Sequence, residues 1–367
     1  MHPWHGFRFN INATCARVRK TESKQIMTND IHIDGSKGEG GGQVLRSALA
    51  LSLATGKPFR MSSIRAGRNK PGLLRQHFTC VKAAAALCDA KVEGMTLGSK
   101  ELSFTPNALK GGNFHFAVGT AGSAILVLQS VLPALVIGSA PVEIAIEGGT
   151  HNPAAPPWEF IDRCYLPTLR KMGARVEARI ERHGFMPAGG GRIVVRIEPV
   201  ERLKPLHLTE RSEQTIKVEA IFANLPIDVP RRMLSATAEK LHLPDDELFL
   251  REVQSSGPGG ALAITVETEE ITNVFSGFAS KGVASEGVAN EALKPTRDFL
   301  SSEASVGRYL ADQLLLPLVL AGGGSFMTTR LSGHTKTNIE TIRHFKDMPV
   351  IVRQHESASK TYQVDIG

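Results

Sequence analysis

The chain has 367 residues, of which 42% are hydrophobic and 22% are charged, and its formal net charge at pH 7 is +7. This is the composition of a globular protein with enough chain for one large core or two domains. Aromatic residues make up only 6% of the chain, which argues against rows of aromatic side chains that stack single-stranded bases.

Much of the positive charge lies in residues 1–29, which hold five Lys and Arg residues and a single acid, Glu22. The overall charge is therefore weak evidence for a nucleic-acid partner. This segment has no sustained hydrophobic period and no apolar stretch of the kind found in signal peptides. We predict that residues 1–29 form a flexible leader and that deleting residues 1–26 leaves activity largely intact.

The four cysteines form no CxxC pair, so the sequence indicates neither a zinc site nor a redox motif, and a reducing cytoplasmic setting fits best. The longest apolar run covers residues 121–138. This run contains Gln129 and Pro133 and has only about the length of a membrane span. We predict a buried core helix here, and no membrane association.

From residue 30 onward the hydrophobic pattern predicts a unit of strands and helices that recurs. The first unit comprises a strand at 31–33, a glycine-rich turn at 38–42, a helix at 43–55, a strand at 59–64, a helix at 73–87 and strands near 91–92 and 101–104. The second comprises a strand at 113–118, a turn at 119–122, a helix at 123–137, a strand at 141–147, a helix at 157–172 and strands near 175–182 and 192–199. A PAGGG turn at 187–191 separates the last two strands.

A third unit is predicted at the far end of the chain. It comprises a helix at 306–320, a strand at 325–329, a helix at about 338–345 and a strand at 350–353. Residues 210–300 interrupt this pattern with strands at 215–220, 262–267 and 273–279, helices at 230–241 and 284–300, and an SSGPGG linker at 255–260. The predicted fold class is therefore α/β, with α+β layers. Three βαβαββ-like units form a core from residues 30–209 and 301–367, and residues 210–300 form a smaller inserted α/β domain.

The first motif with chemical potential is GEGGGQVLR, from Gly38 to Arg46. It matches neither a Walker A loop nor a GxGxxG fingerprint. A glycine-rich turn that opens a helix exposes backbone N–H groups, which favours a phosphate. Glu39 within the turn would repel that phosphate unless a divalent cation lies between them. Glu39 is thus a candidate ligand of Mg²⁺ or Mn²⁺, and the alternative is an exposed turn acid.

The second motif is IRAGRNKPGLLRQH, from Ile64 to His77, in a stretch without any acid between Glu39 and Asp89. Cations near the start of a helix oppose the helix dipole, and a bound polyanion would remove that conflict. The guanidinium group suits bidentate contacts with phosphate. Phosphate binding is the favoured interpretation of this motif, and a solvated basic face is the alternative.

The third motif is SGHTKTN, from Ser332 to Asn338. An unprotonated ring nitrogen of His334 could attack the α-phosphorus of ATP, provided that a partner on the other nitrogen fixes the tautomer. A single histidine is more often a capping or solvated residue. This motif by itself therefore does not decide between a nucleophilic and a purely structural role for His334.

Two weaker features concern polar residues on predicted helices. Gln129 lies in the most apolar helix, where its amide needs a partner, either a core carbonyl or a ligand. In the run RYLADQ, Tyr309, Asp312 and Gln313 lie near one another on a helix and could contact an adenine and a ribose. An ordinary amphipathic helix is the alternative.

In this order, the motifs resemble those of the RNA 3′-terminal phosphate cyclase family. The resemblance spans about Asp34 to Glu340 and rests on DGSKGEGGGQVLRSALALS, IRAGRNKPGLLRQH, GTAGSAILVLQSVLP, GGTHNPAAPP, RHGFMPAGGG, VGRYLADQLLLP and SGHTKTNIE. It implies a fold of three repeats with a smaller α/β domain inserted before the last one. It also implies an enzyme that uses ATP and a divalent metal, Mg²⁺ or Mn²⁺, to convert an RNA 3′-phosphate into a 2′,3′-cyclic phosphodiester.

The same resemblance implies roles for individual residues. His334 matches the nucleophile that becomes adenylylated, and Glu39 matches the metal-binding acid. The phosphate- and RNA-binding residues match Arg46, Arg65, Arg68, Gln76 and His77. The ATP-binding residues match Gln129, Tyr309, Leu310, Ala311, Asp312 and Gln313. The resemblance implies no oligomeric state, physiological RNA or preferred metal.

Three alternatives remain at this point, and the plainest is an anion-binding domain without catalysis. Cyclase-like proteins of ribosome assembly resemble this chain but do not keep the nucleophilic histidine, so His334 in SGHTKTN argues for an active enzyme. Enolpyruvyl transferases resemble the same repeat architecture and use arginines for anions, but they need neither ATP nor a covalent histidine. Transfer of labelled AMP to the protein would separate the cyclase from these alternatives.

Overall fold

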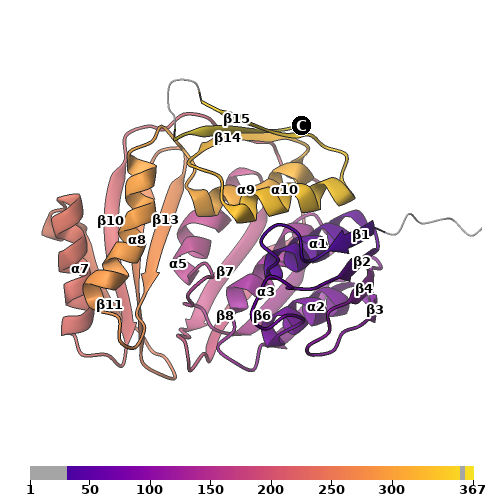
Figure 1. Cartoon of the computed structure of the whole chain (residues 1–367), viewed down its shortest axis with the longest axis horizontal. Helices are drawn as coiled ribbons and strands as arrows, with labels where there is room; N and C mark the ends of the chain where they lie inside the picture. The colour runs from indigo at the N-terminus through magenta and orange to yellow at the C-terminus, as the bar shows by residue number, and fades with distance from the viewer. Residues whose placement is uncertain (1–30, 356–359) are drawn as a thin grey trace, which may run out of the picture.

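The computed structural model describes residues 31–355 and 360–367. The predicted leader at residues 1–29 lies outside this range. Within it, the chain forms four sheets of four strands each, with helices packed between and against them (Figure 1). The prediction of a mixed α/β protein is therefore confirmed.

Three of the sheets share one strand order, in which the first strand along the chain pairs in parallel with the second, and the fourth and third strands follow as antiparallel neighbours. The first contains β1 (Ile31–Asp34), β2 (Phe59–Ser62), β4 (Leu102–Thr105) and β3 (Lys91–Glu93), in that order. The second contains β5 (Gly112–Ala117), β6 (Val142–Gly148), β8 (Gly191–Glu198) and β7 (Arg175–Arg182). The third contains β9 (Leu206–Leu208), β14 (Gly324–Thr328), β16 (Tyr362–Ile366) and β15 (Val350–Gln354).

The short strand β9 was not predicted. It supplies the parallel neighbour of β14 from a point in the chain that precedes the predicted insertion. Three residues are too few for a periodic pattern, so the sequence carried no signal for this strand.

Helices α1 (Gly42–Thr55) and α2 (Arg75–Cys88) pack against each other beside the first sheet. In the second unit, α3 (Ala124–Gln129) and α4 (Leu132–Leu135) replace the single helix predicted for 123–137. Every residue of both helices is buried, so the predicted burial is confirmed and the predicted continuity is wrong. Pro133 explains the break, because its ring has no N–H and would clash with the carbonyl of Gln129 in a continuous helix.

The helix predicted for 157–172 is also divided. It consists of α5 (Trp158–Phe160), a π-helical turn η1 (Ile161–Tyr165) and α6 (Leu166–Lys171). Pro167 lies at the start of α6, where a missing N–H is tolerated. A π-helical turn inside a helix is rare and is often found at functional sites.

The fourth sheet contains β11 (Leu248–Glu252), β10 (Thr215–Ala223), β12 (Gly259–Glu267) and β13 (Thr272–Phe278), in that order. Helices α7 (Asp228–Leu241) and α8 (Ser285–Leu300) accompany it, with a short 3₁₀ turn η2 at Asp245–Glu247. One face of this sheet forms a separate hydrophobic cluster with α7 and α8, while Ile221, Ala263 and Phe278 join the main core. Burial on both faces explains why β12 is apolar without alternation. Strand β11 was not predicted.

Helices α9 (Arg308–Ala321) and α10 (Gly333–Phe345) lie beneath the sheet of β14 and β15, and α10 packs against α1 (Figure 1). The prediction that the last helix begins at about residue 338 is wrong, because α10 begins at Gly333. Ser332 is its N-cap and accepts a hydrogen bond from the N–H of Thr335 at 3.0 Å. Of the helices in the described part of the chain, none is long and apolar enough to span a membrane.

Candidate active site

The glycine-rich turn before α1 meets the first turn of α10. Oε2 of Glu39 lies 2.8 Å from Nδ1 of His334, and the N–H of Glu39 donates to Oγ1 of Thr337 at 3.3 Å. A Cβ atom at position 333 would lie 2.4 Å from Oε1 of Glu39. Gly333 in the SGHTKTN motif therefore allows the carboxylate to reach the histidine beside it.

The imidazole of His334 is half-buried, with 45% of its side chain exposed. Its contact with Glu39 is short but does not have the direction of a hydrogen bond, and Nδ1 has no other hydrogen-bond partner in the described chain. The contact brings a negative charge to one face of the ring and leaves Nε2 without a protein partner in the same residues. A nucleophilic histidine requires a free ring nitrogen, which Nε2 provides, and a hydrogen bond on the other nitrogen, for which Glu39 is within reach but not aligned.

Arg68 completes the group around Glu39. Its Nη2 lies 3.6 Å from Oε2 of Glu39, and both side chains are partly exposed. Such an exposed pair contributes little to stability. The guanidinium of Arg68 is therefore available to an anionic ligand at low cost.

A cleft of about 360 Å³ opens beside His334. It is bounded by three parts of the chain, namely the start of α9, the loop at 154–157 and the sheet that contains β13. Its lining includes Gln43, Arg46, Leu126, Ala154, Ala155, Pro156, Pro157, Phe160, Val274, Ser276, Phe278, Glu291, Arg308, Tyr309, Asp312, Gln313, Ser332 and His334. The structure thus brings the predicted nucleotide-binding helix, the predicted nucleophile and the inserted segment to one cleft.

A smaller cavity of about 40 Å³ shares Gln43, Arg46, Asp312 and Gln313 with the cleft and also contains Gln129. Nε2 of Gln129 is buried without a hydrogen-bond partner in the described residues. A buried donor of this kind is costly unless a ligand or water satisfies it. The position of Gln129 therefore favours the ligand interpretation over a bond to core carbonyls.

Asp312 is the acceptor at the centre of this cavity. Its Oδ1 accepts hydrogen bonds from the amides of Gln43 and Asn338, each at 2.7 Å, and its Oδ2 accepts one from Gln313 at 3.0 Å. Ser47 donates to Oδ1 of Asn338 and so fixes the orientation of that amide. Burial raises the pKa of Asp312, and the nearby His334 and the amide donors oppose this rise.

Arg46 has no hydrogen bond or ion pair with any part of the chain that the structure describes, although it lines both the cleft and the cavity. Burial lowers the pKa of its guanidinium, which nevertheless stays protonated at neutral pH. An unpaired, half-buried cation beside a cleft favours an anionic ligand.

Three other predicted phosphate-binding residues lie next to the cleft without lining it. Arg65 donates to the carbonyls of Lys70 and Gly72, at 2.6 and 3.0 Å, and holds the basic loop closed. Oε1 of Gln76 accepts from the N–H of Ser123 at 2.7 Å, at the start of α3. His77 is buried, and burial together with Arg46 and Arg65 lowers its pKa to about 3.

Leu310 and Ala311 point their side chains into the hydrophobic core, where each is only 1% exposed. Neither residue lines the cleft, so neither offers a nucleotide a direct contact in this structure. Tyr309, in contrast, is 45% exposed and has the guanidinium of Arg308 above its ring, 5.5 Å from the centroid.

No group of three or more His, Cys, Asp and Glu residues in the described part of the chain could hold a metal ion. Glu39 is a single carboxylate next to an anion-binding environment. Mg²⁺ is usually bound in this way, through one or two carboxylates, with substrate phosphates and water as its other ligands. Glu39 therefore fits a metal that arrives with a phosphate ligand, and does not fit a permanent all-protein site.

Sequence reasoning missed several residues of this site, including Asn338, Gln43 and Ser47. Asn338 follows His334 by four residues and therefore lies on the same face of α10. The misplaced start of that helix concealed this relationship. Phe278 and its neighbours on β13 gave no signal, because only tertiary packing brings that strand to the cleft.

Comparison with known proteins identifies the family of this chain. A family model described as RNA 3′-terminal phosphate cyclase matches residues 37–352. Proteins named RNA 3′-terminal phosphate cyclase from Ectopseudomonas mendocina, Koribacter versatilis and Salmonella agona are 47%, 46% and 46% identical to this chain. The alignments cover 88%, 90% and 90% of this chain and 95%, 94% and 96% of the relatives. The chain therefore belongs to the RNA 3′-terminal phosphate cyclase family.

Proposed function

We propose that this protein is an active RNA 3′-terminal phosphate cyclase that proceeds through a covalent histidine–AMP intermediate. The observation that carries the proposal is the placement of His334 at a nucleotide-sized cleft, with Glu39 against one ring nitrogen and the other nitrogen without a protein partner. The cyclase-like binding proteins, which do not keep this histidine, would have no use for such an arrangement.

In the first step, Nε2 of His334 attacks the α-phosphorus of ATP. A nitrogen–phosphorus bond forms and the bond to the leaving pyrophosphate breaks. Glu39 accepts the proton of Nδ1 in a hydrogen bond as the ring charges, so Nε2 carries the lone pair when the reaction begins. A Mg²⁺ or Mn²⁺ ion held by Glu39 and the phosphates would offset charge on the triphosphate.

In the second step, an oxygen of the RNA 3′-phosphate attacks the AMP phosphorus, and the histidine–phosphorus bond breaks. In the third step, the adjacent 2′-hydroxyl attacks the 3′-phosphorus and AMP leaves. The attacking and reacting groups of this last step share one ribose, so proximity supplies much of the acceleration. The need for a 2′-hydroxyl favours RNA over DNA.

The cleft offers separate surfaces for the parts of ATP. Tyr309, Pro156 and Phe278 provide flat or apolar faces for the base, and Asp312 and Gln313 provide polar groups for the ribose. Leu310 and Ala311 pack behind this surface in the hydrophobic core and hold α9 in place. Arg46 and Gln129, which lack protein partners, serve the phosphates of the nucleotide.

The RNA phosphate binds on the other side of His334, in our proposal. Arg68 contacts the phosphate directly, whereas Arg65, Gln76 and His77 hold the segment that presents it. Recognition of the terminal phosphate, with few base contacts, agrees with the scarcity of aromatic residues.

The three sheets with the same strand order belong, in our proposal, to three repeats that form the core at 30–209 and 301–367. The fourth sheet, whose strand order differs, belongs to an inserted domain at 210–300. The free, buried cysteines at positions 80, 88 and 164 are compatible with a reducing compartment, and we propose a cytoplasmic role in RNA processing or repair.

The first experiment incubates the wild type and His334→Ala with α-labelled ATP and Mg²⁺ or Mn²⁺, followed by a denaturing gel. An acid-labile, alkali-stable label on the wild type alone is expected. Absence of label from both proteins, with RNA binding intact, would instead favour a non-catalytic cyclase-like protein. Addition of RNA with a 3′-phosphate is expected to discharge the label and yield a cyclic end.

A further inference from the structure

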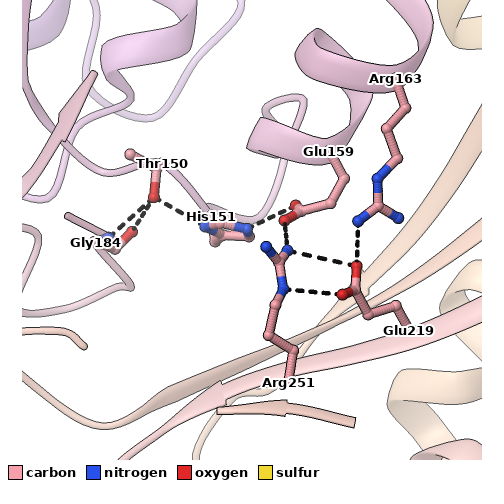
Figure 2. Close-up of polar contacts among 7 residues, drawn as sticks. All are labelled: Thr150, His151, Glu159, Arg163, Gly184, Glu219 and Arg251. Atoms are coloured by element: carbon pink, nitrogen blue, oxygen red, sulfur yellow. Dashed lines mark hydrogen bonds and ion pairs between the residues drawn. The ribbon is translucent and has the colours of Figure 1, made fainter. Parts of the chain in front are cut away.

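Five charged or ionisable residues form a connected network away from the reacting groups (Figure 2). His151 and Glu159 belong to the second unit, as does Arg163 in the π-helical turn. Arg251 lies on β11 and Glu219 on β10, in the fourth sheet. The network therefore joins two parts of the molecule that have separate hydrophobic clusters.

The central pair is fully buried. Nε2 of His151 lies 2.7 Å from Oε2 of Glu159, and their side chains are 0% and 1% exposed. The carboxylate can only accept, so Nε2 of His151 donates to it. Nδ1 of His151 lies 2.9 Å from the hydroxyl of Thr150, which itself accepts from the N–H of Gly184 at 2.9 Å (Figure 2). Every polar atom of the imidazole thus has a partner.

Arg251 extends this pair into the fourth sheet. Its Nη2 donates to Oε1 of Glu159 at 2.5 Å, and its Nε lies 2.9 Å from Oε1 of Glu219. Arg163 donates to Oε2 of Glu219 at 2.5 Å. The two carboxylates and two guanidinium groups alternate, so the network carries no net charge when His151 is neutral.

Three glycine-rich segments pack around the same network. His183 stacks on His151 with centroids 5.4 Å apart and pairs with Ser255 in an isolated β-bridge. A Cβ atom on Gly259 would lie 2.2 Å from the side chain of Phe185. The RHGFMPAGGG segment therefore packs tightly against the SSGPGG linker, beneath the GGTHNPAAPP loop.

The hydrogen bond between His151 and Glu159 joins the two ends of the loop that connects them, and the middle of this loop forms a wall of the cleft. Residues 154–157, between the two, line the cleft beside Tyr309. The fourth sheet, which Arg251 joins to this base, supplies Val274, Ser276 and Phe278 to the same cleft. One network thus connects both walls.

We propose that His151, Glu159, Arg251 and Glu219 form a positioning network that sets the width of the nucleotide cleft without touching the nucleotide. The inference rests on the proposed function of that cleft. None of the four residues lines the cleft. The carboxylate of Glu159 is fully buried, whereas the side chain of Arg251 is 36% exposed. Alternating charges that meet at a buried carboxylate are costly to break and have strict geometric requirements, which suits them to fix two walls relative to each other.

The test uses the full-length protein with Arg251→Met, which removes the charge, and Arg251→Lys, which keeps it. The matched control is Arg232→Met. Arg232 makes a bidentate ion pair with Glu286 between α7 and α8, in the same part of the chain but away from the cleft. For each protein the ATP concentration for half-maximal self-labelling, the maximal labelling rate and the melting temperature are measured.

Arg251→Met is expected to raise the half-maximal ATP concentration by at least about tenfold, because small displacements of a binding wall are costly, while the maximal rate changes by less than about threefold. Arg251→Lys recovers part of the affinity, and Arg232→Met retains the wild-type ATP dependence. An unchanged ATP dependence in Arg251→Met, with only a lower melting temperature, would mean a purely structural role and would overturn the proposal.

If Arg251→Met does not fold, Glu219→Gln serves in its place, since it keeps the shape of the side chain and weakens both ion pairs of Glu219. If the wild type takes up no AMP label, the proposed function fails. The role of the network in ATP binding is then tested separately, by measuring ATP affinity in equilibrium binding experiments. Equal affinities of wild type and variant would then refute it.

Discussion

The carboxylate of Glu39 and the imidazole of His334 lie 2.8 Å apart, although they come from opposite ends of the described chain. We expect Glu39→Gln to slow histidine adenylylation by about 100-fold, because the amide cannot stabilise the charge that develops on the ring. The measurement is the initial rate of label transfer from α-labelled ATP. Glu340→Gln, which alters an exposed acid on the same helix, serves as the control.

The metal dependence of the same variant separates two roles of Glu39. If Glu39 also binds the metal, Glu39→Gln raises the Mg²⁺ or Mn²⁺ concentration needed for half-maximal labelling. An unchanged metal requirement with a slower rate would restrict Glu39 to orienting His334.

Tyr309 is the exposed aromatic residue of the cleft. We expect Tyr309→Ala to weaken ATP binding by about tenfold, in line with the energy of a base stacked on an aromatic ring, and Tyr309→Phe to retain most of the affinity. Equilibrium binding of ATP measures the effect. Phe249→Ala, which removes an equally exposed ring on β11 outside the cleft, is the control. Equal losses in Tyr309→Phe and Tyr309→Ala would point to the hydroxyl group instead of the ring.

Asn338 donates to Asp312 at 2.7 Å in a buried site. We expect Asn338→Asp to destabilise the fold by about 3 kcal/mol at neutral pH, because two buried carboxylates would then face each other. The folded protein would bind a proton at this pair more tightly than the unfolded chain does. The loss is therefore smallest at low pH and grows as the pH rises.

Urea unfolding of this variant at several pH values checks the prediction. Asn290→Asp is a suitable control, since Asn290 is exposed and accepts a hydrogen bond from Lys240, which would favour a carboxylate. A loss of stability in Asn338→Asp that does not depend on pH would contradict the prediction.

Glu159 stabilises the fold in a pH-dependent way. Burial alone would raise its pKa, but His151 and Arg251 lower it from 4.5 to about 2. Because the folded pKa lies below the unfolded one, the stabilisation of about 3 kcal/mol is complete above about pH 5 and is lost as the pH falls toward 2. We therefore expect the difference in unfolding free energy between wild type and Glu159→Gln to shrink over that range. If the difference in unfolding free energy between the two proteins stayed constant with pH, ionisation of Glu159 would not contribute to stability.

His77 is a base, whereas Glu159 is an acid, but the stabilisation that each provides is lost in the same direction, as the pH falls. Burial, Arg46 and Arg65 lower its pKa from 6.5 to about 3, so it is neutral in the folded protein. Its contribution is complete above the unfolded pKa and is lost as the pH falls from 6.5 toward 3, where the unfolded chain takes up a proton first. His77→Gln is expected to flatten the fall in unfolding free energy between pH 6.5 and about 4, and urea unfolding at several pH values measures it.

Much of the fold could be predicted, because strands such as β6 and helices such as α8 have clear hydrophobic periods. The failures have local physical causes. Pro133 divides a helix that is apolar throughout, and the capping role of Ser332 was not recognised. Strands β9 and β11 escaped prediction because one is very short and the other is largely exposed.

Of the candidate site, the sequence predicted the residues of the local motifs but not the contacts that these residues make. His334, Glu39, Tyr309 and Gln129 belong to distinctive local motifs and were identified from the sequence. Gln76 and Arg65 belong to such motifs too, but they bond to backbone atoms next to the cleft. The motif indicates that a residue matters for the site and does not indicate which atom it contacts.

The sequence by itself determined the order of the motifs, the chemistry of their side chains and the membership of a family, since each of these depends on residues near one another in the chain. Only the tertiary structure decided that Glu39 lies against His334, that β13 forms a wall of the cleft and that Arg251 joins that wall to Glu159. These contacts arise between distant segments when sheets and helices pack to bury apolar surface. A local pattern shows which face of a segment is buried, but it contains no information on which partner buries it.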